Sequence, residues 1–247
     1  MTLHKPAHVR LAALAGAAIL TVTGLTAGTA TAQQEDPVPP PECVFDLPVP
    51  PPTIIGDNLD NVIFGTPGPD VINGMGGNDT IFGLGNNDIL IGGPGNDILF
   101  GGAGPDEIYG AIGDDVIDGG VGDDFLDGGD GADTLNGGHG PDRVLGQTGQ
   151  DVISGDTEND LICAGAGNDR AHGAHGDDTV FGGTENDQIR GGSENDDLYG
   201  GPGDDTMEGM DGDDFLSGEA GLNDFGNGGP GLLDVCTAST EVQINCP

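Results

Sequence analysis

The sequence has few positive charges and few aromatic residues. Of its 247 residues, 5 are Lys or Arg and 43 are Asp or Glu, none is Trp, and aromatic residues make up 4%. The formal net charge is −38 at pH 7. Proteins that bind nucleic acids or anionic lipid surfaces need Lys and Arg to neutralise phosphate groups. We therefore expect neither nucleic acid nor an acidic membrane surface as a partner.

Motifs of several common functional sites are also missing. There is no Cys-x-x-Cys pair for a zinc knuckle or a thioredoxin-like site, and no G-x-S-x-G or H-E-x-x-H motif. Matches to G-x-G-x-x-G are inevitable in a chain with 50 glycines, and no strand–helix unit surrounds them. No helical period is present that could flank an EF-hand loop. The sequence therefore contains no candidate catalytic or nucleotide-binding residues.

Hydrophobic residues are scarce for a chain with this charge. They make up 34% of the sequence, and such a combination with a strong like charge is typical of disordered segments. If the chain folds, its carboxylates must be neutralised by something other than its own side chains.

The N-terminus has the three parts of a secretory signal peptide. Lys5 and Arg10 precede an apolar stretch from Leu11 to Leu25, and Ala30-Thr31-Ala32 provides a cleavage site. A membrane anchor is the alternative, but the run is short and is followed by acids and prolines. We expect residues 1–32 to be removed, giving a secreted, extracellular protein without a membrane span. All 43 acids and only 3 arginines would remain, for a net charge of −40.

The segment after the predicted signal peptide is rich in proline. Residues 33–53 contain eight prolines and predict an extended, semi-rigid arm without hydrogen-bonded structure. Four cysteines remain in the exported chain, Cys43, Cys163, Cys236 and Cys246. An even number of cysteines in an exported chain indicates disulfide bonds.

A nine-residue period organises the chain from Gly65 onward. Five residues before each repeat Asp stands Gly, sixteen times in seventeen, with Ala164 as the exception. Two residues after each Asp stands an apolar residue, and only Ala171 is small there. Self-similarity at a fixed short period is the signature of a repeat architecture. The repeat aspartates, seventeen in unbroken succession, are Asp70, Asp79, Asp88, Asp97, Asp106, Asp115, Asp124, Asp133, Asp142, Asp151, Asp160, Asp169, Asp178, Asp187, Asp196, Asp205 and Asp214.

The residue types in each repeat predict a turn followed by a short strand. The six residues Gly92–Asp97 have turn composition, and the next three, Ile98–Phe100, predict a strand whose middle side chain points inward. Nine residues make half a coil, so two repeats close one coil of a solenoid whose strands stack in parallel about 4.8 Å apart. We expect this all-β roll over residues 54–218, and degenerate repeats with a C-terminal cap over residues 219–247.

Stacking coils brings like charges together. Repeat carboxylates eighteen residues apart would lie within a few ångströms of each other, and one buried apolar side chain per repeat offsets little of the ordering entropy. A cation between adjacent coils reverses the sign of this interaction. Carboxylate and carbonyl oxygens in a flexible cage suit Ca²⁺, whereas Mg²⁺ prefers a tighter octahedron with bound waters. Seventeen repeats give up to about fifteen stacked pairs and as many Ca²⁺ ions.

The repeat resembles the RTX, or haemolysin-type, calcium-binding nonapeptide G-G-x-G-x-D-x-U-x. The resemblance covers Gly65 to Gly218, with a degenerate copy at Gly56–Phe64 in which Asn61 replaces the aspartate. It implies a right-handed parallel β-roll in which repeat aspartates and glycine-region carbonyls hold Ca²⁺ between turns. We carry this ligand role onto the seventeen aspartates named above. Beyond them the spacing slips to ten residues at Asp224 and Asp234, which we leave out of the ligand set.

The function that these patterns predict is that of a secreted, non-catalytic protein that folds on binding extracellular calcium. Two alternatives stay open. One is an adhesive or cell-surface structural protein, and the other is a calcium-binding module left from, or accessory to, a secreted enzyme or toxin. Residues 33–53 and 219–247 are too short to form such an enzyme domain.

One outer face of the predicted roll is apolar. It collects Ile89, Ile91, Tyr109, Phe125, Leu145, Leu161, Cys163, Phe181 and Tyr199. The proline-rich arm, with Val44, Phe45, Leu47 and Val49 beside Cys43, could dock there and be fastened by a Cys43–Cys163 bond while Cys236 pairs with Cys246. The alternative is a free arm with an unpaired or intermolecular Cys163.

Overall fold

The computed structural model describes residues 40, 43, 50–221, 223–231, 234–237 and 243–244. The predicted signal peptide and most of the proline-rich arm lie outside these residues. The described residues belong to one compact unit within residues 37–247. No helix in this described part is long and apolar enough to cross a membrane.

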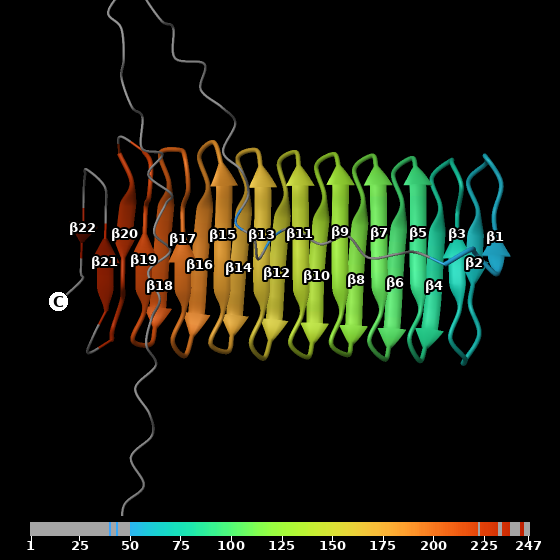
Figure 1. Ribbon diagram of the computed structural model, residues 1–247, viewed down its shortest axis with the longest axis horizontal. Coiled ribbons are helices and arrows are strands. Elements are labelled where there is room, and N and C mark those ends of the chain that lie inside the picture. The colour runs from blue at the N-terminus through green and yellow to red at the C-terminus, as the bar shows by residue number, and fades with distance from the viewer. Residues whose placement is uncertain are drawn as a thin grey trace, which may run out of the picture. The chain divides into compact units, whose positions relative to one another are not determined.

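The strands form two parallel eleven-stranded sheets, and successive strands alternate between them (Figure 1). The first sheet contains β1 (Ile54–Ile55), β3 (Val71–Asn73), β5 (Ile89–Pro94), β7 (Glu107–Ile112), β9 (Phe125–Asp130), β11 (Arg143–Thr148), β13 (Leu161–Ala166), β15 (Thr179–Thr184), β17 (Asp197–Tyr199), β19 (Phe215–Ser217) and β21 (Val235–Thr237). The second contains β2 (Val62–Phe64), β4 (Thr80–Gly85), β6 (Ile98–Ala103), β8 (Val116–Val121), β10 (Thr134–His139), β12 (Val152–Thr157), β14 (Arg170–His175), β16 (Gln188–Ser193), β18 (Thr206–Asp211), β20 (Phe225–Asn227) and β22 (Gln243–Ile244).

The strand register confirms an all-β parallel solenoid. Leu99 of β6 pairs with Ile81 of β4 and Ile117 of β8, so aligned residues are eighteen positions apart. The same spacing holds from β1 to β17. It lengthens to nineteen between β18 and β20 and to twenty between β19 and β21 because the intervening turns carry one or two extra residues.

The strands are longer than the three residues that the sequence predicts. Most have six, and β6 continues from Ile98–Phe100 into the glycine-rich positions that composition assigns to the turn. Gly102 pairs with Gly120 of β8 while both have positive φ, 111° and 104°. Glycine adopts this backbone conformation without a Cβ clash, so the ladder extends into the bend.

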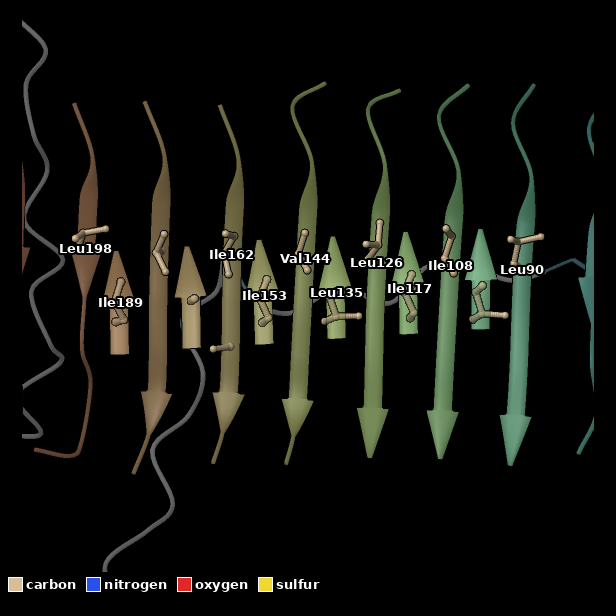
Figure 2. Close-up of a cluster of buried hydrophobic side chains, with 14 of the residues drawn as sticks. Leu90, Ile108, Ile117, Leu126, Leu135, Val144, Ile153, Ile162, Ile189 and Leu198 are labelled. Carbon is tan, nitrogen blue, oxygen red and sulfur yellow. The ribbon is translucent and has the colours of Figure 1, made fainter. Parts of the chain in front are cut away.

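The hydrophobic core is two columns of single side chains enclosed between the sheets (Figure 2). Leu90, Ile108, Leu126 and other first-sheet residues face Ile117, Leu135, Ile153 and their second-sheet counterparts. Each is the second residue of its strand and is at most 3% exposed. The inward orientation predicted for the middle of each strand triplet is therefore confirmed.

The ladders continue beyond residue 218. Strands β20, β21 and β22 pair with β18, β19 and β20 in parallel. The segment that we expected to hold degenerate repeats and a cap thus adds further strands to both sheets, at least over its described residues.

The proline-rich arm is joined to the outer face of the first sheet. Cys43 forms a disulfide bond with Cys163 of β13, with 5.9 Å between their Cα atoms. The hypothesis of this pairing is confirmed, and the alternative of an unpaired Cys163 is wrong. The Cys43 N–H donates to Pro40 O at 2.8 Å, so this part of the arm is hydrogen-bonded, unlike the predicted extended arm. Cys236 is also disulfide-bonded, while Cys246 lies outside the described residues.

An outer apolar cluster surrounds this disulfide bond. Phe125, Leu145 and Cys163 are at most 7% exposed although they point away from the core, and Cys43, Tyr109, Leu161 and Phe181 pack against them. The arm residues Val44, Phe45, Leu47 and Val49 lie outside the described residues, so their docking on this face stays a prediction.

Removing the Cys43–Cys163 bond should destabilise the folded chain. The bond closes a loop with a sequence separation of 120, and closing a loop of that length removes unfolded-state entropy worth about 5 kcal/mol. We expect the double variant Cys43→Ser/Cys163→Ser to lose stability of that order in chemical denaturation under identical conditions. Non-reducing peptide mapping of the unmodified chain is the control. A free Cys163 thiol, or unchanged stability of the variant, would contradict this assignment.

Candidate metal centre

All seventeen predicted site aspartates are buried. Their exposed fractions range from 0% to 9%. Each stands immediately before a strand, so the alternation of the strands places the aspartates in two columns at the inner sides of the turns. One column precedes the first sheet and comprises Asp70, Asp88, Asp106, Asp124, Asp142, Asp160, Asp178, Asp196 and Asp214. The other precedes the second sheet and comprises Asp79, Asp97, Asp115, Asp133, Asp151, Asp169, Asp187 and Asp205.

One oxygen of each carboxylate links neighbouring coils. From Asp79 to Asp214, every repeat Oδ1 accepts the backbone N–H of the residue eighteen positions earlier, at 2.7 to 3.0 Å. In Asp142, for example, Oδ1 accepts the N–H of Asp124. This N–H precedes the strand and has no partner in the sheet ladder. The carboxylate column therefore continues the backbone hydrogen bonding around the turn.

The other oxygen has no partner within the described part of the chain. Oδ2 of all sixteen aspartates from Asp79 to Asp214 is buried without a hydrogen bond. Burying a single unpaired carboxylate oxygen costs free energy, and a charged one costs much more. A column of such atoms at each turn is incompatible with a stable fold unless a cation or protons neutralise it.

The glycine that precedes each aspartate by five residues leaves space beside this oxygen. A Cβ on Gly101 would lie 2.5 Å from Asp106 Oδ2 and 2.6 Å from Gly119 O in the next coil. Both distances are shorter than any real Cβ contact. The pattern of glycines therefore has a steric cause, because a carboxylate oxygen and a carbonyl oxygen converge where a side chain would begin.

The donor set consists of oxygen atoms. Among the described residues, no three His, Cys, Asp or Glu side chains lie close enough together to hold a metal ion. A bound cation must therefore take backbone carbonyl oxygens in addition to one or two carboxylates. Hard cations with many oxygen ligands and tolerant geometry, such as Ca²⁺, fit this set, whereas transition metals that prefer nitrogen or sulfur do not.

The two ends of the columns differ from the sequence-based ligand set. Asp70 is the first member, and its Oδ2 accepts both the N–H and the hydroxyl of Thr66, so it is satisfied without a cation. At the other end, Asp224 and Asp234 are 2% and 4% exposed. Their Oδ1 atoms accept the N–H groups of Asp205 and Asp214.

Asp224 and Asp234 lie outside the predicted ligand set, but the structure places them in line with it. They occupy the same position as the regular repeat aspartates, and Asp234 Oδ2 is also a buried oxygen without a partner. A search that allowed one extra residue in the turn would have found both.

Burial raises the pKa of the repeat carboxyl groups. The pKa of Asp160, Asp187 and Asp196 rises to about 8, because burial disfavours the charged form. The hydrogen bond from the previous coil opposes this rise, and the stacked carboxylates add to it. The pKa of Asp124 and Asp151 in the middle of the columns, and of Asp88 and Asp214 near their ends, rises to about 6. Without a cation, much of each column would be protonated near neutral pH.

The fold is a repetitive parallel β-solenoid that carries two columns of buried carboxylates along its turns. The profile of the RTX calcium-binding nonapeptide repeat family, which spans four copies, matches overlapping segments from residue 55 to residue 225. The chain therefore belongs to this family. No curated protein matches the chain.

In excess chelator, the roll should form more readily at acidic pH. A carboxyl group whose pKa is raised from 3.8 to between about 6 and 8 contributes stability that is fully present below about pH 4. That stability is lost as pH rises through 6 to 8. We expect a metal-free β signal in circular dichroism near pH 5 that disappears by pH 8. Sedimentation velocity at each pH separates folding from aggregation. A metal-free β signal that grows from pH 5 to pH 8 would contradict the raised pKa values.

Proposed function

We propose that the chain is a secreted, non-catalytic calcium-binding protein that folds when extracellular Ca²⁺ fills its turns. The observation that carries this proposal is the set of sixteen buried Asp Oδ2 atoms without a hydrogen-bond partner. Family membership supports calcium as the ion. In this proposal each coil of a right-handed roll consists of two nine-residue repeats, and up to about fifteen ions bind between coils.

Two kinds of residue would hold the ions, the repeat aspartates and the glycines that precede them. The aspartates from Asp79 to Asp214, together with Asp234, would supply the carboxylate ligands, and Asp224 continues their column. The glycine five residues before each regular repeat aspartate, with Ala164 before Asp169 as the exception, keeps the neighbouring carbonyl oxygen within reach. Bound Ca²⁺ supplies positive charge at the point where each buried carboxylate lacks a partner. Because no site forms in the unfolded chain, the free energy of binding becomes free energy of folding.

Net charge supports the same conclusion. The predicted exported chain carries 43 acids against 3 arginines, and Arg190 forms an exposed ion pair with Glu208. Exposed pairs of this kind contribute about 0–1 kcal/mol. Side-chain ion pairs therefore do not neutralise the interior, and under this proposal bound Ca²⁺ does.

Two features support secretion. Residues 1–32 have the composition of a signal peptide, and the Cys43–Cys163 bond is of a kind that persists in oxidising compartments. Calcium in such compartments reaches the range in which extracellular sites bind, with dissociation constants of about 10⁻⁴ to 10⁻³ M.

The first test is the calcium dependence of folding. We expect the chain at pH 7.5 to be largely disordered in excess chelator, and to gain β signal and compactness cooperatively at millimolar Ca²⁺. Circular dichroism and small-angle scattering measure the two changes, and Mg²⁺ at equal concentration is the control. The same compact β signal in excess chelator at this pH would refute the proposal.

The second test compares an interior with a terminal aspartate. Asp142→Asn keeps an oxygen that can accept the Asp124 N–H but removes the negative charge. The variant should therefore bind the cation more weakly at this turn. Because Asp142 lies in the middle of the stack, where each coil is stabilised by both neighbours, the loss should affect the whole roll. Asp70→Asn is the matched control, because Thr66 already satisfies that side chain. We expect the thermal midpoint in calcium to fall by several degrees for Asp142→Asn and to change little for Asp70→Asn. Equal shifts would contradict the assignment of ligand roles.

A further inference from the structure

One repeat departs from the others at two inward-facing positions. Ala164 stands where the sixteen other repeats have Gly, five residues before the aspartate. It is fully buried, with 0% exposure, and belongs to the core cluster. Seven residues later, Ala171 stands where every other repeat has Val, Ile, Leu or Met, and it is 3% exposed. The two exceptions therefore occur together, in the adjacent strands β13 and β14.

Contacts in normal repeats show why these two positions depend on each other. A Cβ on Gly182 would lie 3.0 Å from Ile189 Cδ1, and a Cβ on Gly65 would lie 3.2 Å from Ile72 Cδ1. In both cases the partner is the core residue seven positions later. These distances are too short for ordinary carbon–carbon contact. A methyl group at the glycine position would therefore press on the core side chain, and in the repeat of Ala164 the small side chain of Ala171 removes this contact.

The same methyl group also competes with the carboxylate. A Cβ on Gly182 would lie 2.6 Å from Asp187 Oδ2 and 2.6 Å from Gly200 O. In the repeat of Ala164 the corresponding atoms are Asp169 Oδ2 and Gly182 O, and the methyl group is present. Asp169 keeps its place in the column, because its Oδ1 accepts the Asp151 N–H at 2.8 Å. Its Oδ2 is buried without a hydrogen-bond partner as in the other repeats, but here the Ala164 methyl group takes the space that glycine leaves beside that oxygen elsewhere.

We propose that Ala164 and Ala171 are a compensating pair. The Ala164 methyl group fills the space beside Asp169, so that the chain binds one calcium ion fewer than it would with a regular repeat at this position. The loss of an ion rests on the proposed calcium-binding function, whereas the steric coupling of the two alanines does not. The repeat keeps its strands and its core contacts, and the methyl group of Ala164 replaces volume that Ala171 lacks.

A double-mutant cycle on the intact chain tests the steric coupling. Ala171→Ile alone should lower the thermal midpoint in millimolar calcium by several degrees, because the larger side chain meets the Ala164 methyl group. Ala164→Gly/Ala171→Ile restores the residue types of a regular repeat, and its midpoint should return to that of the unmodified chain or higher. If Ala171→Ile alone fails to fold, recovery of folding in the double variant still measures the coupling.

The next coil provides a matched control. Gly182→Ala should lower the midpoint, because the new methyl group meets Ile189, Asp187 and Gly200. Gly182→Ala/Ile189→Ala transplants the alanine pair into a regular repeat. Its midpoint should fall by less than the sum of the falls measured for Gly182→Ala and Ile189→Ala separately. Additive effects in both cycles would overturn the pairing.

Native mass spectrometry, which counts bound ions directly, tests the effect on the metal. With Ca²⁺ as the probe, the Ala164→Gly/Ala171→Ile chain should bind one ion more than the unmodified chain, and Gly182→Ala/Ile189→Ala one ion fewer. Unchanged counts together with a strong coupling would overturn the metal part of the inference while leaving the proposed function intact. An unmodified chain that binds no calcium would instead refute the proposed function.

Discussion

The constraint on which this structure depends is the burial of a carboxylate in every turn. One oxygen of each group is fixed by a backbone N–H of the previous coil, and the other has no partner. A coil can be added only if its carboxylate is neutralised, so charge compensation and strand stacking are a single event. The hydrophobic columns give the coil its inner surface, but with one apolar side chain per repeat they cannot hold carboxylates at this spacing.

This coupling explains how so acidic a chain can have an ordered interior. Without cations, burial of the carboxylates and repulsion within the two columns oppose folding. The same free-energy cost raises the pKa of groups such as Asp160 and Asp187, so that these groups take up protons when the chain folds. Under the proposed function, millimolar calcium removes that cost, and each filled turn makes the next coil easier to form. The Cys43–Cys163 bond acts independently of the ions, since it reduces the entropy of the unfolded chain.

Sequence reasoning recovered the features that depend on a strict period. The two-residue distance from Asp to the core side chain fixed the inward face correctly, as Leu99 and Ile117 show. It set Asp224 and Asp234 apart from the regular repeats because inserted turn residues break the period, although they leave the strand pairing parallel and continuous. It also missed the length of the strands, because composition assigns Gly101 and Gly102 to a turn although their backbones continue the ladder. The disulfide partner of Cys43 did not follow from the sequence, which left both a Cys43–Cys163 bond and a free arm open until the structure decided between them.

Whether a repeat glycine can be replaced depends on whether the new side chain would point outward, to solvent, or inward, toward the aspartate column. At the fourth turn position, Glu158 and Glu194 replace glycine with φ of 74° and 77°, yet their side chains point outward. There they accept hydrogen bonds from the adjacent Thr157 and Ser193 hydroxyl groups and from N–H groups of the previous coil, which offset the backbone strain. At the inward first position no such compensation is open to a polar side chain, because two oxygens already converge there. The one substitution found there is the methyl group of Ala164, and it occurs together with a small core residue, Ala171, seven positions later.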